Sequence, residues 1–285
     1  MRKCDKIALG TVQFGLHYGI NNPNGKVKAH EITRILQYAK DHGVDLIDTA
    51  KGYGTSESVL GENDLKPFKI VTKISGATDI HSQILDSLSK LKAKTLYGIL
   101  IHNFELFRKN PTMLLELQFL KEKKIVQKIG FSLNRTTELD YLFDNKIDFD
   151  MVQIPYNLFD RRFEVYFEKL NSRGVEIHAR SVFLQGLFFL SKESIPSYLK
   201  GVTPTLEKLH HLVEKYNLNI ASLALNFIIK NDFVDKTVIG VTNLDELKSN
   251  IEALRDINFV KNLSSELDCL IVEDENLILP MNWKK

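Results

Sequence analysis

Four polar side chains stand at or just beyond the ends of short apolar runs, where a buried strand should stop. Asp48 ends one run, and Tyr53 follows it closely. Lys73 lies near the end of the next run, and His102 closes the third. In a parallel sheet or barrel the carboxyl ends of the strands form the ligand-binding edge, so groups from successive strands converge there. A carboxylate, a phenol, an ammonium and an imidazole at one place predict a proton-transfer site.

Lys73 carries most of this prediction because its strand should be buried on both faces. An unpaired ammonium is very costly to bury, so Lys73 needs a carboxylate partner, and Asp48 ends the preceding strand. The same cation favours the phenolate of a neighbouring tyrosine, which makes Tyr53 a usable general acid. His102 could donate a hydrogen bond to the same substrate oxygen. Together the four groups suit reduction of a carbonyl to an alcohol.

Taken singly, three of these residues also have a structural interpretation. Asp48 could cap a helix, Tyr53 could be a loop aromatic, and His102 could be a hydrogen-bonded core histidine. The buried lysine is what favours a reacting site.

The elements that must position these groups alternate along the chain. β-rich runs lie at 6–11, 45–50, 68–74, 95–102, 126–132, 150–155, 175–181 and 236–241. Segments of helical period lie at 29–42, 56–63, 78–92, 111–123, 136–145, 162–173, 203–216 and 244–255, with an inserted helix at 219–230. Repeated strand-then-helix units without a proline- or glycine-rich linker predict a single closed (β/α)₈ TIM barrel domain over residues 1–285.

A doubly wound open sheet is the alternative fold. No Gly-x-Gly-x-x-Gly follows an early strand, so a nicotinamide cofactor would not be held in the Rossmann manner.

Composition excludes several function classes. With 44% hydrophobic residues, 26% charged residues and a formal net charge of +2, the chain is typical of a soluble globular protein, and its scattered charges predict no nucleic-acid partner. No run is long enough to span a membrane or to act as a secretory signal. Cys4 and Cys269 are far apart, and no cluster has metal-ligand spacing. We expect a cytoplasmic protein without a metal, of undetermined oligomeric state.

The chain resembles the aldo-keto reductases over essentially its whole length. The stretch Gly43–Gly61, which contains Asp48 and Tyr53, is highly specific. The other matching segments follow in the family's order and are Leu9–Gly15, Val71–Lys73, Ile101–His102, Lys128–Ser132, Val152–Asn157, and Val238–Gly240 with Asn250.

The resemblance implies NAD(P)H-dependent reduction of an aldehyde or ketone in a (β/α)₈ barrel. Tyr53 would supply the proton, Lys73 and Asp48 would tune it, and His102 would orient the carbonyl. The implied cofactor-binding residues are Gly10, Thr11, Ser132, Gln153, Arg180, Ser181, Gly240, Thr242 and Asn250. Among them, Ser132 and Gln153 match residues that hold the nicotinamide carboxamide.

Three departures from the family pattern affect ligand binding. Arg180 replaces a tyrosine that stacks on the nicotinamide, so it could stack there, grip an acidic substrate or form a structural salt bridge. Thr242 and Glu246 stand where many members present a cation to the 2′-phosphate; NADPH is the expected cofactor from the family's habit, with NADH as the alternative. Asn134 is shifted by one position, so its carboxamide role is not carried over.

Substrate choice in a barrel depends on the strand-to-helix loops, here 12–28, 103–110, 157–161, 183–202 and the C-terminal tail. Phe14, Phe104 and Asn157 are the candidate substrate residues, although such aromatics also occur as ordinary loop packing. The segments Gly15–Asn22 and Ser181–Gly186 resemble a bacterial subset associated with polysaccharide and unusual-sugar biosynthesis. The expected substrate is a small-molecule carbonyl compound, and this resemblance points to a keto or aldehyde sugar.

Two other functions compete with the reductase. A strand lysine in a barrel can form a Schiff base, so Lys73 could serve a lyase. The barrel could also be a cofactor-binding regulatory protein with little turnover.

Overall fold

The computed structural model describes residues 3–76 and 79–283, and its strands form a closed parallel barrel. The strands are β1 (Ile7–Gly10), β2 (Leu46–Asp48), β3 (Lys69–Ile74), β4 (Leu96–Ile101), β5 (Val126–Ser132), β6 (Met151–Pro155), β7 (Glu176–Arg180) and β8 (Lys236–Gly240). Each pairs in parallel with the next, and β8 pairs back with β1. The predicted (β/α)₈ TIM barrel is therefore confirmed.

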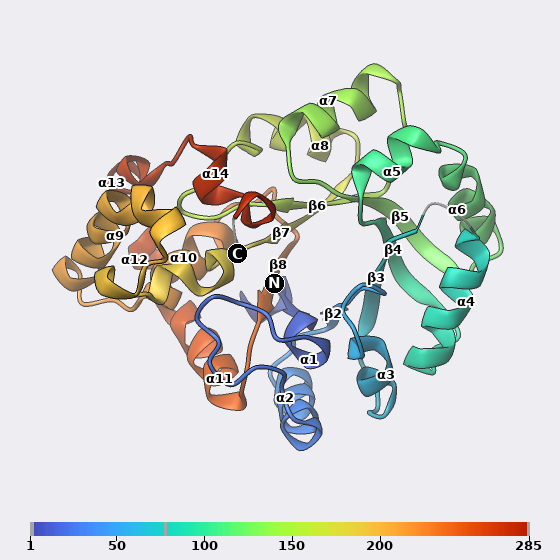
Figure 1. Ribbon diagram of the computed structural model, residues 1–285, viewed down its shortest axis with the longest axis horizontal. Coiled ribbons are helices and arrows are strands. Elements are labelled where there is room, and N and C mark those ends of the chain that lie inside the picture. Colours follow the sequence, from blue (N-terminus) through green and yellow to red (C-terminus); the bar gives the residue numbers. More distant parts are fainter. Residues whose placement is uncertain (1–2, 77–78, 284–285) are drawn as a thin grey trace.

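Helices surround the strands on the outside of the barrel (Figure 1). The helices are α1 (Val12–Gly15), α2 (Ala29–Asp41), α3 (Ser56–Gly61), α4 (Ile80–Leu91), α5 (Phe104–Lys109), α6 (Met113–Glu122), α7 (Thr136–Asp144), α8 (Phe167–Ser172), α9 (Thr203–Lys215), α10 (Ile220–Ile229), α11 (Leu244–Ala253), α12 (Ile257–Lys261), α13 (Ser264–Leu267) and α14 (Glu275–Ile278). Residue 78, the expected start of the helix at 78–92, lies outside the described residues.

Two expected loops and one expected helix are among the segments that differ from the sequence prediction. The expected loop 103–110 contains α5, because the Asn103 side chain caps it by accepting from the backbone N–H of Glu105 at 3.0 Å and because Phe107 is buried beneath it. The expected loop 12–28 begins with α1. The expected helix 162–173 is instead a 3₁₀ turn over Glu164–Tyr166 followed by α8.

A small apolar cluster fills the inside of the barrel and sets the height of the polar groups. It consists of Ala8, Leu46, Val71, Leu100, Met151 and Val238, one residue from each of six strands. Side chains two positions apart on a strand share a face, so the next inward-facing position lies one layer closer to the carboxyl ends. That position is Asp48 on β2, Lys73 on β3 and Gln153 on β6. The strand period therefore places these three polar groups in one layer, next to the small apolar cluster and closer to the carboxyl ends of the strands.

The opposite end of the barrel is closed by a separate polar network. Glu176 accepts hydrogen bonds from Tyr97 at 2.7 Å and from Lys128, and its other oxygen lies 2.7 Å from Nε2 of His178. Burial opposes ionisation of Glu176, but these partners prevail and hold its pKa at about 2. This carboxylate stabilises the amino-terminal end of the barrel, away from the ligand-binding edge.

Two features are absent from residues 3–76 and 79–283. No helix in that part of the chain combines the length and apolarity that crossing a membrane requires. Nor does it hold a group of three or more His, Cys, Asp or Glu side chains placed to bind a metal ion.

Candidate active site

The centre of the site is a fully buried ion pair. Lys73 Nζ donates to Asp48 Oδ1 at 2.6 Å, with the two side chains 0% and 3% exposed. Lys73 Nζ also donates to the Thr49 carbonyl at 3.0 Å, and Asp48 Oδ2 accepts from Gln153 Nε2 at 2.7 Å. Burial lowers the pKa of Lys73, but the attraction of Asp48 and Tyr53 outweighs it, so this pKa lies above its ordinary value. The lysine therefore stays an ammonium.

Tyr53 completes the coordination of that ammonium. Lys73 Nζ donates to the Tyr53 hydroxyl at 3.3 Å and lies 4.9 Å from the centre of its ring. The Tyr53 ring also meets His102 edge to face, with centroids 5.8 Å apart. Because Nζ is protonated, fully buried and donating to three oxygens, it is not available as a Schiff-base nucleophile.

Two glycines let the chain bring Tyr53 to this position. A Cβ on Gly15 would lie 1.7 Å from the Tyr53 carbonyl oxygen, so only glycine allows α1 to approach this loop so closely. Gly54 has a φ of +59° and its own Cβ would lie 2.7 Å from the Gly15 carbonyl oxygen. A side chain at Gly15 or Gly54 would therefore push apart the two backbone segments whose contact positions the Tyr53 phenol.

His102 is held as a neutral imidazole. Burial lowers its pKa, the charges of Lys73 and Arg180 lower it further, and Asp48 only partly offsets them, so the pKa falls from 6.5 to about 4. A neutral imidazole can donate a hydrogen bond to a carbonyl oxygen without adding a charge to the site.

This pKa predicts the pH dependence of the site. Since His102 takes up a proton only near pH 4, we expect kcat/KM for a neutral aldehyde to show no acid limb from His102 near pH 6.5. Steady-state rates from pH 8 down to the acid limit of stability, at roughly half-unit steps, would measure this. An acid limb near 6.5 that disappears in His102→Gln would contradict the neutral imidazole.

A cavity of about 950 Å³ opens over this group. Its wall includes Asp48, Tyr53 and His102, whereas Lys73 lies behind them. All the residues expected from the sequence to contact a cofactor also line it, namely Gly10, Thr11, Ser132, Gln153, Arg180, Ser181, Gly240, Thr242 and Asn250. One cavity is therefore lined both by the proton-transfer residues and by all of the expected cofactor-binding residues.

Two of the three expected substrate residues lie elsewhere. Phe14 is fully buried in the core between strands and helices, because α1 turns its side chain away from the cavity. Asn157 is also fully buried; its Oδ1 accepts from the backbone N–H of Phe159 at 2.9 Å and its Nδ2 donates to the Ser181 carbonyl at 3.0 Å. Both expectations were wrong, whereas Phe104 does line the cavity.

Arg180 is fixed by neutral oxygens. Its Nη2 donates to the Leu133 carbonyl at 2.8 Å and to Asn134 Oδ1 at 2.6 Å, and its Nη1 donates to Ser181 Oγ at 3.1 Å. The shifted Asn134 therefore positions the guanidinium. Among the ion pairs of the described residues none involves Arg180, so the expected alternative of a structural salt bridge is wrong.

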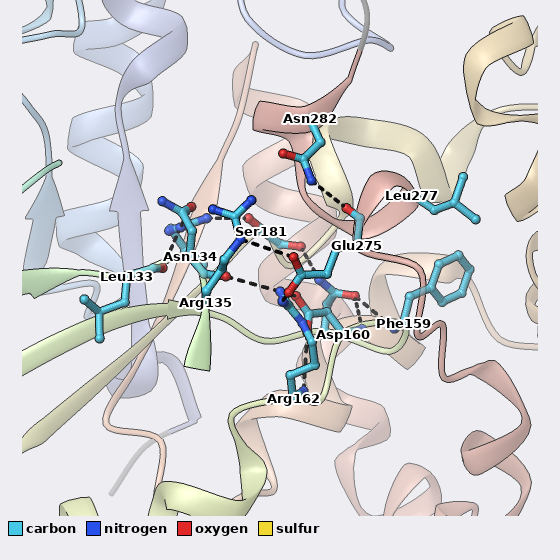
Figure 2. A network of polar contacts seen from close by, with 12 residues as sticks. Leu133, Asn134, Arg135, Phe159, Asp160, Arg162, Ser181, Glu275, Leu277 and Asn282 are labelled. Carbon is cyan, nitrogen blue, oxygen red and sulfur yellow. Dashed lines mark hydrogen bonds and ion pairs between the residues drawn. The ribbon is translucent and has the colours of Figure 1, made fainter. Parts of the chain in front are cut away.

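The neighbouring wall is braced by the C-terminal segment, as Figure 2 shows. Glu275 at the start of α14 accepts from Arg135 Nε at 3.2 Å and from Arg162. Arg162 also donates from Nε to Asp160 Oδ1 at 2.9 Å. These contacts join the ends of β5 and β6 to the C-terminal segment, whose Pro280 and Met281 also line the cavity.

Sequence reasoning missed a contact between two loops over the cavity. Gln185 Nε2 donates to the Tyr18 hydroxyl at 3.0 Å, and the Gln185 carbonyl accepts from the backbone N–H of Ile20 at 3.0 Å. Burial and nearby Tyr53 raise the pKa of Tyr18, so this second phenol stays neutral. One indication of this contact was present in the sequence. The two loops contain the segments Gly15–Asn22 and Ser181–Gly186, which resemble the same bacterial subset of the family.

The aldo/keto reductase family model matches residues 6–271 of the chain. The chain belongs to this family, which makes it an oxidoreductase of the carbonyl-reducing kind in a family that generally uses NAD(P)H.

The chain is also similar to individual proteins. Protein Tas of Escherichia coli (strain K12) is 24% identical, over 87% of this chain and 89% of the relative. L-glyceraldehyde 3-phosphate reductase of the same strain is 25% identical, over 51% of this chain and 49% of the relative. The solved structure of aldo-keto reductase AKR11C1 from Bacillus halodurans, in its holo form, matches the fold with a TM-score of 0.72 at 18% identity, covering 94% of each chain.

Proposed function

We propose that this single barrel domain reduces an aldehyde or ketone to the alcohol with Tyr53 as the general acid. The observation that carries the proposal is the Tyr53 hydroxyl at the cavity wall, 3.3 Å from the buried Nζ of Lys73. A bound reduced nicotinamide dinucleotide supplies the hydride in this chemistry.

Each residue has a distinct part in the proton transfer. Tyr53 gives its hydroxyl proton to the carbonyl oxygen as charge develops there. The Lys73 ammonium stabilises the phenolate that remains, and Asp48 keeps the ammonium in place. His102, neutral at physiological pH, donates an N–H to the same oxygen and orients the carbonyl.

The cavity wall fits a dinucleotide. Ser132 and Gln153 would hold the nicotinamide carboxamide of the dinucleotide. The backbone near Gly10 and Gly240 would contact the rest of the cofactor. Within the described residues, the buried Oε1 of Gln13 has no hydrogen-bond partner, which suits an acceptor that awaits a ligand donor.

The wall near Thr242 favours NADH over NADPH. Glu246 accepts from the Thr242 backbone N–H at 2.8 Å and from the Thr242 hydroxyl at 2.6 Å, which fixes a carboxylate there. Lys248 forms an ion pair with Asp245 at 3.0 Å and does not line the cavity beside Thr242. A 2′-phosphate would meet negative charge, whereas a ribose hydroxyl could donate to it.

Removing that charge should change cofactor preference. We expect Glu246→Gln to raise the affinity for NADPH by about tenfold and to change the affinity for NADH much less. Quenching of protein emission during titration measures both dissociation constants without turnover. Glu252→Gln, on the same helix but outside the cavity wall, is the control. Tighter binding of NADPH than of NADH by the unaltered protein would refute this preference.

The reductase itself is tested by mixing the protein with a reduced dinucleotide and 4-nitrobenzaldehyde. Loss of nicotinamide absorbance that requires both protein and aldehyde, with formation of the alcohol, is the expected result. A panel of aldehyde and keto sugars would then test the sugar substrate. A folded protein that binds dinucleotide but oxidises none of it with any carbonyl compound would refute the proposal.

A further inference from the structure

Arg180 at the cavity wall has no counter-charge among the described residues. Asp48 is paired with Lys73, and Arg135 pairs with Glu275 at 3.2 Å. Arg180 instead contacts only neutral oxygens in the part of the chain that the structure describes. Arg180 is half-buried at the cavity wall, and a guanidinium that is partly withdrawn from water without a counter-charge favours the binding of an anion from outside.

The guanidinium is also held ready for a ligand. Nη2 uses its hydrogens on Leu133 and Asn134, and Nη1 uses one on Ser181. The Nε–H and the other Nη1–H of Arg180 have no partner among the described residues. Because the three bonds fix the side chain before any ligand arrives, little ordering entropy remains to be lost on binding.

The charge of Arg180 acts on the space where the chemistry takes place. Burial is the largest cause that lowers the pKa of His102, the charge of Lys73 is the second and the charge of Arg180 is the third. The charge of Arg180 also opposes the rise in the pKa of Tyr18. Arg180, His102 and Tyr18 all line the same cavity. Gln185 adds a buried Oε1 with no partner among the described residues, an acceptor for a ligand hydroxyl.

We propose that Arg180 binds a carboxylate or phosphate group of the substrate, which makes the substrate an anionic, hydroxyl-bearing aldehyde or ketone. This inference rests on the proposed carbonyl reduction and names its substrate class. Arg180 is then a specificity-determining residue. It binds the anionic group of the substrate, while Tyr53 and His102 donate hydrogen bonds to the substrate carbonyl oxygen.

Matched substrates test this proposal. We would compare kcat/KM for 4-carboxybenzaldehyde and 4-nitrobenzaldehyde, which are alike in shape but differ in charge and in carbonyl reactivity, and for glycolaldehyde phosphate and glycolaldehyde. The change of each ratio on substitution of Arg180 reports the effect of the charge. A preference in the first pair identifies a carboxylate, and in the second a phosphate. The variants are Arg180→Met, Arg180→Lys and, as control, Arg135→Met, whose guanidinium is already paired. Each ratio is taken within one variant, so partial unfolding cancels.

We expect at least one anionic member to be preferred by about tenfold or more, mainly through KM. Arg180→Met should abolish the preference, Arg180→Lys should keep part of it, and Arg135→Met should leave it unchanged. A ratio that is the same in Arg180→Met and in the unaltered protein would overturn the inference while leaving the reductase intact.

Calorimetric titration with terephthalate and with inorganic phosphate gives a second readout that needs no turnover. Binding of either probe that is lost in Arg180→Met but kept in Arg135→Met supports the anion site even if reduction fails. Equal binding by all variants, or binding of neither probe together with no anionic preference, would contradict it.

Discussion

Replacing Tyr53 with phenylalanine should reduce turnover by a factor of about 10²–10⁴ while dinucleotide affinity stays unchanged. The phenylalanine ring keeps the packing against His102 but has no proton to give to the carbonyl oxygen. Single-turnover oxidation of the reduced dinucleotide measures the chemical step, and quenching of protein emission measures binding.

Tyr18→Phe is the matched control for this variant. Tyr18 is also a phenol of the cavity wall, but its hydroxyl is bonded to Gln185, and Lys73 donates to Tyr53 instead. We expect Tyr18→Phe to lose far less turnover. Comparable losses in the two variants would mean that Tyr53 is not the particular proton donor.

Asp48→Asn should destabilise the protein by about 3–5 kcal/mol, because it leaves the ammonium of Lys73 buried without its counter-charge. The same change should abolish most turnover. Urea denaturation followed by circular dichroism gives the free energy of unfolding. The double variant Asp48→Asn with Lys73→Met removes the buried charge and should recover much of the stability.

Asp86→Asn is the control for the charge change. Asp86 also contacts two lysines, Lys51 and Lys90, but it is 42% exposed, so its loss should cost only about 0–1 kcal/mol. A loss for Asp48→Asn no larger than that for Asp86→Asn would show that the buried pair does not stabilise the barrel.

The strand period explains why the central residues could be predicted from the sequence. Asp48 and Lys73 each follow a residue of the inner apolar cluster by two positions, so alternation alone places both on the inner face near the carboxyl ends. The cost of burying an ammonium then requires the contact between them, which the structure shows at 2.6 Å.

Loop residues could not be placed in this way, because loops have no period. Phe14 and Asn157 are of types that line binding sites, yet α1 turns Phe14 into the core and a backbone turn uses Asn157. The contact between Tyr18 and Gln185 depends on left-handed backbone, with Gln185 itself at a φ of +56°. Such conformations are set by tertiary contacts and are not readable from residue type.

The most direct test follows a deuterium atom from the cofactor to the product. The protein is given a reduced dinucleotide deuterated at its transferable position together with a test aldehyde, and the alcohol is analysed by mass spectrometry. The account predicts one deuterium on the alcohol carbon and almost no labelled alcohol from Tyr53→Phe in the same time. Unlabelled product from the folded, unaltered protein, or labelled alcohol formed equally fast by both proteins, would contradict it.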